Sequence, residues 1–223
     1  SCRLLRAVNG TTVCVALVDG VHVANVGDCD SFLCWSTELG WETKDLAPHH
    51  SPSNSSEAER VRSEHPGEPE CISADGRLLT LRAIGDLHFK LPNDLVQPLA
   101  DNYGPSPVQH LFGHLAVNKT PPYMSHMPDV FHVRPPVGAR RSFLVLASDG
   151  LDHLVSRACG KPLVPLSMAR IAAAVGRKDP RAINMAVEVI WESLIGERDM
   201  ETLVTKASRR DDVTVAVVPV DAV

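Results

Sequence analysis

Three features of the sequence predict an α+β fold. Apolar strand patterns occupy the beginning, the middle and the end of the chain, and helical patterns are grouped between them. No strand–helix–strand unit recurs, which separates this layout from a repeating α/β one. The length of 223 residues and the hydrophobic content of 44 % suit a single domain over residues 1–223.

The chain opens with a predicted hairpin. Residues 12–18 and 21–26 are β-rich, and Asp19-Gly20 between them is a two-residue turn signal. Residues 32–35 add a third short strand after the break that Gly27-Asp28 makes in the pattern. An antiparallel sheet is therefore expected at the start of the fold.

A polar loop and a charged helix follow. His49 and His50 lie in the loop beside a proline, and we expect both to be exposed. Ser56 and Glu59, three residues apart, form a capping-box pattern, so residues 57–64 are predicted to be a helix with a solvated charged face. After it, a turn signal leads into strand-like residues 77–82.

Residues 91–128 contain seven prolines and little periodicity. Prolines at this density interrupt helices and strands, so this segment is predicted to be a long surface insertion with sparse regular structure.

The second half is predicted to hold paired strands, helices and a last strand. Residues 130–133 and 142–147 look like partners, and residues 213–218 form a β-branched run typical of a buried strand. Between them, Asp179 and Pro180 are expected to begin a helix. The residues that share its predicted core face are Ile183, Val187, Ile190 and Leu194.

Composition excludes several classes of protein. A formal charge of −5, with Lys and Arg spread along the chain, disfavours nucleic acid as a partner. The longest apolar runs are far shorter than the ~20 residues that span a bilayer, so no membrane span and a soluble protein are expected. Six cysteines without a Cys-x-x-Cys pair favour a reducing, intracellular compartment.

Aspartates recur at the ends of the apolar strand patterns. They are Asp28, Asp86, Asp149 and Asp211. Gathered carboxylates repel one another unless a hard cation lies among them, and Mg²⁺ or Mn²⁺ prefers such oxygen ligands. For any one of them, a solvated Asp-Gly turn is the simpler alternative.

Five blocks, taken in order, resemble successive motifs of the metal-dependent protein serine/threonine phosphatases of type 2C. They are residues 10–12 (GTT), 24–28 (ANVGD), 82–86 (RAIGD), 143–150 (FLVLASDG) and 211–215 (DDVTV). Residues 57–66 (EAERVRSEHP), 76–90 (GRLLTLRAIGDLHFK) and 120–124 (TPPYM) are similar to the pyruvate dehydrogenase phosphatase branch of that family.

The resemblance implies a four-layer α/β/β/α sandwich of two antiparallel sheets flanked by helices, with two or more Mg²⁺ or Mn²⁺ ions at one end. It implies that Asp149, Asp211 and Asp86 are metal ligands. The residues it places in support of them are Arg82, Gly150, Asp212 and Asp28. The implied substrate is a phosphoserine or phosphothreonine protein, with the pyruvate dehydrogenase complex and a mitochondrial location suggested by the branch.

Departures from the family pattern leave a second function open. The segment that supplies the family's phosphate-binding arginine and first metal motif would lie upstream of Ser1, so no catalytic residue is assigned within this chain. Cys29-Asp30 replaces the usual Ser-Arg, Asp152 stands where Trp is common, and Asp212 stands where Asn is common. The alternative is a catalytically inactive module that binds a phosphoprotein or a regulator.

Overall fold

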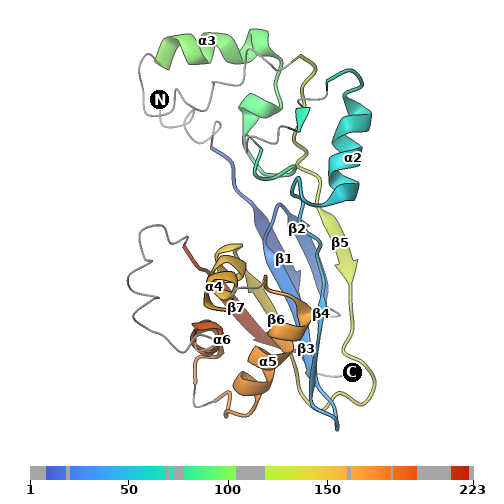
Figure 1. The fold of residues 1–223 in the computed structure, drawn as a ribbon, viewed down its shortest axis with the longest axis vertical. Coiled ribbons are helices and arrows are strands. Elements are labelled where there is room, and N and C mark those ends of the chain that lie inside the picture. Colours follow the sequence, from blue (N-terminus) through green and yellow to red (C-terminus); the bar gives the residue numbers. More distant parts are fainter. Residues whose placement is uncertain are drawn as a thin grey trace. The chain divides into compact units, whose positions relative to one another are not determined.

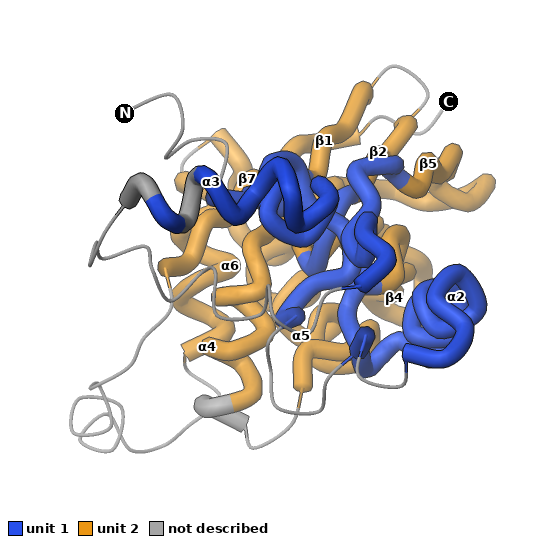
Figure 2. Tube along the Cα trace, turned by 90° about the horizontal axis from the view of Figure 1, so that it is seen from above, with its two compact units in different colours: residues 1–13, 26–28, 49–128 blue, residues 14–25, 29–48, 129–223 orange. Residues whose placement is uncertain are grey.

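The structure is a computed structural model (Figure 1). It describes residues 9–18, 21–68, 71–72, 78–103, 119–159, 162–181, 183–194 and 212–220. The chain divides into two compact units, coloured separately in Figure 2. Unit 1 contains residues 1–13, 26–28 and 49–128, and unit 2 contains residues 14–25, 29–48 and 129–223.

Two antiparallel sheets form the centre of unit 2 (Figure 1). The strands are β1 (Val13–Leu17, whose first residue belongs to unit 1), β2 (His22–Val26, whose last residue belongs to unit 1), β3 (Asp30–Ser36), β4 (Trp41–Asp45), β5 (Asp129–His132), β6 (Ser142–Ala147) and β7 (Val215–Pro219). The three-stranded sheet has the order β1-β2-β5, and the four-stranded sheet has the order β4-β3-β6-β7. The expected α+β class and the N-terminal hairpin are confirmed.

The two faces of the four-stranded sheet belong to two different cores. Because side chains alternate along a strand, Leu33 and Leu144, which are register partners in β3 and β6, point to the face that packs with the three-stranded sheet. Their neighbours Phe32 and Phe143 point to the opposite face and pack against helices. All four side chains are at most 3 % exposed, so these two strands are buried on both faces.

Three helices cover the outer face of the four-stranded sheet. They are α4 (Gly150–Cys159), α5 (Pro165–Gly176) and α6 (Met185–Leu194). The start of α5 is held by Ser167, whose Oγ accepts a hydrogen bond from the Val164 N–H at 2.9 Å. At its end, a Cβ on Gly176 would lie 2.0 Å from the Trp41 ring, so only glycine permits this close approach.

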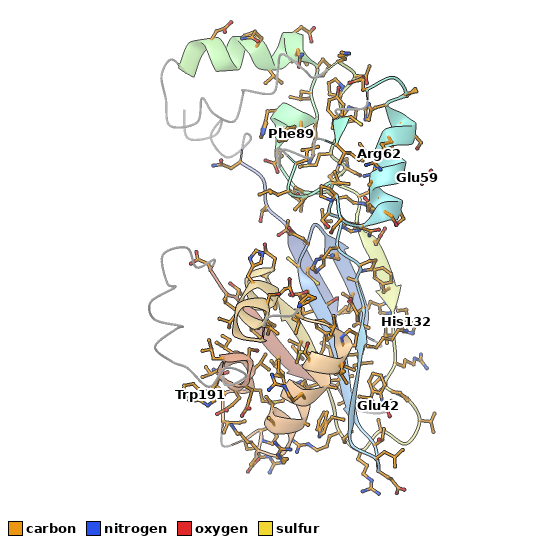
Figure 3. All side chains as sticks on the ribbon, viewed as in Figure 1. Glu42, Glu59, Arg62, Phe89, His132 and Trp191 are labelled. Atoms are coloured by element: carbon orange, nitrogen blue, oxygen red, sulfur yellow. The ribbon has the colours of Figure 1, made fainter. Side chains whose placement is uncertain are left out.

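Helix α6 differs from its prediction in both its start and its buried face. The Asn184 side chain caps it by accepting from the Ala186 N–H at 3.1 Å, because Asp179 is used in a turn that ends at Arg181. Val189 is fully buried, whereas Val187 is 58 % exposed. Trp191 (Figure 3) is 52 % exposed, so the core face is rotated away from the one that the sequence predicted.

Unit 1 is built from helix α2 (Ser55–Glu64), the short helix η2 (Leu87–Phe89), helix α3 (Asn93–Tyr103) and connecting segments. The core of the unit has its own apolar cluster, formed by Ala58, Val61, Cys71, Ile72, Leu78, Leu81, Ala83, Tyr123 and Met124, with Phe89 packed against it. Helix α2 is capped by Asn54, which accepts from the Ser56 N–H at 3.2 Å. Asn54 thus takes the place predicted for Ser56.

Three further predictions about the elements are corrected. Residues 130–133 and 142–147 are both strands, but β5 pairs with β2 and β6 pairs with β3 and β7. In place of the strand expected over residues 77–82, the described part of this range forms an isolated bridge between Arg82 and Ser125. Helix α3 runs through Pro98 inside the proline-rich segment, where regular structure was expected to be sparse.

Cys14, Cys29, Cys34 and Cys71, which lie in the described part of the chain, form no disulfide there. Burial raises the pKa of the Cys14 thiol to about 12 and that of Cys34 further. Both thiols therefore stay protonated at neutral pH and act as small apolar side chains. No described helix has the length and hydropathy needed to cross a bilayer.

Replacing Leu144 by alanine is expected to destabilise the chain by roughly 3 kcal/mol, because it opens a cavity between the two sheets where the leucine is 0 % exposed. The matched control is Leu166→Ala in α5, where the leucine is 82 % exposed and the change should lie within about 0.5 kcal/mol. Urea unfolding followed by fluorescence measures both. Equal losses in the two variants would contradict the assignment of the inter-sheet core.

Candidate functional site

The segment that carries Asp149 leaves the end of β6 and lies against the segment that enters β7. The Ser148 N–H donates to the Thr214 carbonyl at 3.0 Å, and the Thr214 N–H donates to Ser148 Oγ at 3.1 Å. Ser148 Oγ–H also donates to the Asp212 carbonyl at 3.2 Å. The fold thus brings two predicted site residues, Asp149 and Asp212, to the same edge of the four-stranded sheet.

Gly150 is required by this close approach. A Cβ on Gly150 would lie 2.3 Å from the Asp212 carbonyl oxygen, a contact that side chains do not make. The glycine therefore lets α4 begin directly beside the strand that follows Asp212. Asp211, the other predicted ligand in this segment, lies outside the described residues.

The Asp149 carboxylate lies where a negative charge is favoured. It is half-buried, and its side chain forms no hydrogen bond or ion pair with the residues that the structure describes. It precedes the first turn of α4, where unpaired backbone N–H groups favour a negative charge. A carboxylate of this kind fits a hard divalent ion, which takes oxygen ligands and retains water.

Asp86 lies in unit 1 and is held in an unusual backbone conformation. Its φ of 48° and ψ of 44° are left-handed, and it immediately precedes η2. A Cβ on Gly10 would lie 1.7 Å from Asp86 Oδ2, so the glycine makes room for the carboxylate. Burial raises the pKa of Asp86, and the positive charge of Lys90 opposes that shift.

The motif blocks around Asp86 interlock through their backbones. Thr11 and Ile84 exchange N–H to carbonyl hydrogen bonds at 2.8 and 2.9 Å. A Cβ on Gly85 would lie 2.3 Å from the Asn9 carbonyl, and one on Gly27 would lie 2.2 Å from the Thr12 methyl. These contacts explain why Gly27 and Gly85 cannot carry a side chain. They also place the blocks of residues 10–12, 27–28 and 84–86 together within unit 1.

Arg82 forms a buried ion pair with Glu57 of α2. Arg82 Nε–H donates to Glu57 Oε2 at 3.0 Å, Nη2–H donates to Oε1, and Nη1–H donates to the Met127 carbonyl at 3.0 Å. The two side chains are 10 % and 8 % exposed. Burial disfavours the charge on Glu57, but the hydrogen bonds and charges of Arg82 and Arg60 outweigh it and hold the pKa of this carboxyl below its ordinary value.

Glu57 is an exception to the solvated charged face predicted for residues 57–64. It is 6 % exposed, whereas Glu59 and Arg62 on the same helix (Figure 3) are exposed. The partner that buries it is 25 residues away, so no local pattern distinguishes it from the other glutamates of α2. Arg82 was expected to support Asp86, and the hydrogen bonds above connect it to Glu57 and Met127.

His50 is fully buried, and the expectation that it is exposed was wrong. Its Nδ1 accepts from the Gly27 N–H at 3.0 Å, and its own backbone N–H donates to the Gly27 carbonyl at 2.9 Å. The residue therefore holds the loop of residues 27–28, which places Asp28.

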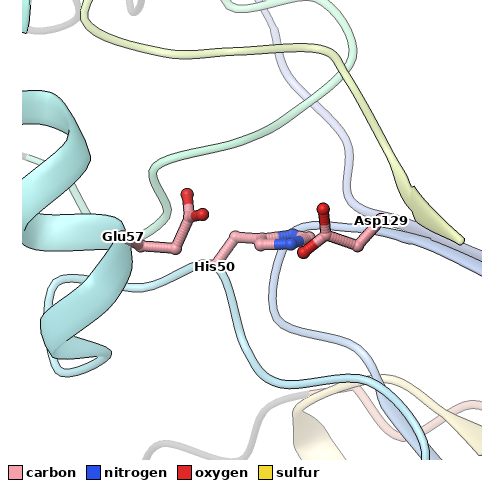
Figure 4. Close-up of side chains that lie close together, drawn as sticks. All are labelled: His50, Glu57 and Asp129. Carbon is pink, nitrogen blue, oxygen red and sulfur yellow. The ribbon is translucent and has the colours of Figure 1, made fainter.

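His50 and Glu57 also offer metal-ligand atoms within 4.8 Å of each other in unit 1 (Figure 4), and Asp129, drawn with them, is the first residue of β5 in unit 2. In unit 1 the hydrogen bond from Gly27 and the ion pair with Arg82 already give both side chains structural roles.

Comparison with known proteins shows the family to which the chain belongs. The protein phosphatase 2C family profile matches residues 5–169, and the chain belongs to this family. Two solved structures share its fold. Serine-threonine phosphatase 2C from Toxoplasma gondii matches with a TM-score of 0.56 and 18 % identity, covering 97 % of this chain and 60 % of that one. A C. elegans sex determining protein matches with a TM-score of 0.55 and 18 % identity, covering 95 % of this chain and 40 % of that one.

Among curated relatives, the chain is similar to two human mitochondrial enzymes. It is 32 % identical over 201 residues to [pyruvate dehydrogenase [acetyl-transferring]]-phosphatase 2, covering 86 % of this chain and 37 % of that protein. It is 38 % identical over 162 residues to human [pyruvate dehydrogenase [acetyl-transferring]]-phosphatase 1, covering 68 % of this chain and 30 % of that protein. The chain thus spans about a third of the length of these relatives.

Replacing Arg82 by methionine is expected to cost about 3–5 kcal/mol at pH 7, because it removes one partner of a buried ion pair and leaves the Glu57 charge poorly compensated. The control is Arg140→Met, whose pair with Glu38 is 68 % and 82 % exposed and should cost about 1 kcal/mol or less. Chemical denaturation measures both free energies of unfolding.

The Arg82→Met loss should depend on pH. Because the folded-state pKa of Glu57 is lowered, the stability that this carboxylate contributes is present above its unfolded pKa of about 4.3 and is lost as the pH falls through the folded value. The difference between wild type and variant should therefore shrink in acid. A difference that is unchanged at low pH would assign the loss to packing rather than to charge.

Proposed function

We propose that this protein is a Mg²⁺- or Mn²⁺-dependent phosphatase that hydrolyses phosphoserine and phosphothreonine in proteins. The observation that carries the proposal is the position of Asp149 at the end of β6, beside the segment of Asp212 and with Gly150 fitted against it. Family membership supports both the reaction class and the dependence on a metal ion.

In this proposal Asp149 and Asp211 hold metal in unit 2, and Asp86 holds a further ion in unit 1. Bound divalent ions lower the pKa of a water molecule and stabilise the charge that develops during displacement at phosphorus. The chain's own contribution is to fix the carboxylates: Ser148 and Gly150 fix the segment of Asp149, and Gly10 and the left-handed backbone fix Asp86.

For the substrate we propose the pyruvate dehydrogenase complex and, with it, a mitochondrial location. The support is the identity of 32–38 % to the mitochondrial phosphatases named for that complex. A phosphopeptide from the complex and an unrelated phosphoserine peptide would distinguish this substrate from a broader specificity.

The alternative is an inactive module that binds a phosphoprotein. Of the substitutions that motivated it, Asp152 has a structural explanation: its Oδ1 accepts from the Leu163 N–H and so holds the segment before α5 against α4. This substitution therefore carries little weight for loss of activity.

The test is metal-dependent phosphate release from a phosphoserine peptide by the natural protein, together with Mn²⁺ binding to the 223-residue chain measured by water-proton relaxation. Asp149→Asn is expected to abolish release and to weaken Mn²⁺ binding at least tenfold. Asp179→Asn is the matched control, since this exposed residue keeps the Oδ1 that accepts from the Arg181 N–H.

Release that ignores Mg²⁺ and Mn²⁺, or that survives Asp149→Asn, would contradict the proposal. Metal binding that depends on Asp149 without phosphate release from any phosphopeptide would favour the binding module.

A further inference from the structure

A cavity of about 210 Å³ lies in unit 2, where β6 begins and β7 ends (Figure 1). Asp149 stands beyond the other end of β6, roughly 20 Å along the strand direction, so this cavity is separate from the candidate metal site. Its lining combines apolar side chains with two arginines, Arg140 and Arg141. An apolar cavity of about 150 Å³ is large enough for benzene, so the space suits a small organic molecule.

The apolar part of the lining is contributed by Phe143, Pro180, Met185 and Pro219. Phe143 and Met185 also pack with the core beneath the helices, so this wall is held in place from behind. Ser142, which lines the cavity as well, already donates its Oγ–H to the Val220 carbonyl at 2.6 Å. The wall therefore offers a ligand apolar surface, and the hydrogen-bond donors come from the arginines.

Arg141 is fixed at both its backbone and its side chain. Its backbone N–H donates to Ser36 Oγ at 3.0 Å, and its carbonyl accepts from the Ser36 N–H at 2.8 Å. Its Nη1–H donates to the carbonyl of Gly176, the last residue of α5. A guanidinium has five N–H groups, and this is the one hydrogen bond that they make with the residues that the structure describes. The other N–H groups can therefore bind a ligand.

The charge of Arg141 is not balanced by a carboxylate in the described part of the chain, where this side chain forms no ion pair. Arg140 differs, because its Nη2 pairs with Glu38 Oε1 at 2.8 Å. The two glutamates of the neighbouring helix α6 both pair with Lys178. The cavity thus presents one positive charge beside an apolar wall, which is complementary to an anion with an apolar body.

We propose that this cavity binds a small organic carboxylate, with the carboxylate oxygens on the N–H groups of Arg141 and the apolar body against Phe143 and Met185. A carboxylate fits better than a phosphate group because its two oxygens match one planar guanidinium, whereas three phosphate oxygens need further donors. Arg140 is already engaged by Glu38. Binding in this cavity does not depend on the proposed phosphatase activity.

The first experiment follows the methionine methyl signals of the 223-residue chain by NMR during titration with benzoate, with the Met185 signal assigned by its loss in Met185→Leu. The expected result is a saturable shift of this signal with a dissociation constant on the order of 1 mM, in keeping with the size of the ligand. Benzamide, which lacks the charge, and inorganic phosphate, which lacks the apolar body, should bind about tenfold more weakly or worse. A Met185 signal that ignores benzoate, or that responds equally to benzamide or phosphate, would overturn the proposal.

Two variants of Arg141 test the role of the guanidinium. Arg141→Gln and Arg141→Lys are each expected to weaken benzoate binding by about tenfold, and the lysine keeps the positive charge and a donor for the Gly176 carbonyl, which protects the fold. The control is Arg177→Gln, which removes the same charge from an exposed residue outside the lining and should bind benzoate as the wild type does. Wild-type affinity in Arg141→Lys, or an equal loss in Arg177→Gln, would contradict the assigned role of the guanidinium.

The second experiment measures urea unfolding of the wild type and Arg141→Lys in the same concentration of benzoate. At ten times the dissociation constant, a ligand that binds only the folded state lowers the unfolding constant by about tenfold, and this effect is expected in the wild type alone. Equal changes in the two proteins would show that benzoate acts as a general solute, and the proposal would fail.

Discussion

The burial of β6 on both faces is the constraint on which the arrangement of unit 2 depends. Leu144 packs between the sheets and Phe143 packs under the helices, so β6 can neither slip by one residue nor turn over without exposing one core. Hydrogen bonds to β3 on one side and to β7 on the other fix its register. The end of this strand is therefore a fixed point, and Asp149 stands two residues beyond it.

Besides its apolar cluster, unit 1 is organised by polar groups that pair in its interior. Glu57 and Arg82 neutralise each other under α2, and His50 exchanges hydrogen bonds with Gly27. Such groups are costly to bury alone, but with their partners they allow very few arrangements of the surrounding segments. Short segments that lack regular secondary structure are thereby held well enough to position Asp28 and Asp86.

Glycines connect the sequence motifs to the geometry of the site. Gly10 leaves room for the Asp86 carboxylate, Gly27 for Thr12 and Gly150 for the Asp212 carbonyl. Each of these contacts joins two motif blocks, and in three blocks a glycine stands directly beside an aspartate, as Gly27-Asp28, Gly85-Asp86 and Asp149-Gly150. The same dipeptides would also suit ordinary turns, so their meaning depends on what lies opposite them in space.

The sequence by itself determined the α+β class, most strand positions and the phosphatase 2C family, because these follow from local periodicity and from short blocks in a fixed order. Only the tertiary structure decided that Glu57 and His50 are buried and that β5 pairs with β2. Each of these outcomes requires a partner far along the chain: Arg82 is 25 residues from Glu57, and Gly27 is 23 residues from His50. A local pattern contains no information about such a partner, because burial of a charge or an imidazole becomes favourable only when folding brings the complementary group into contact.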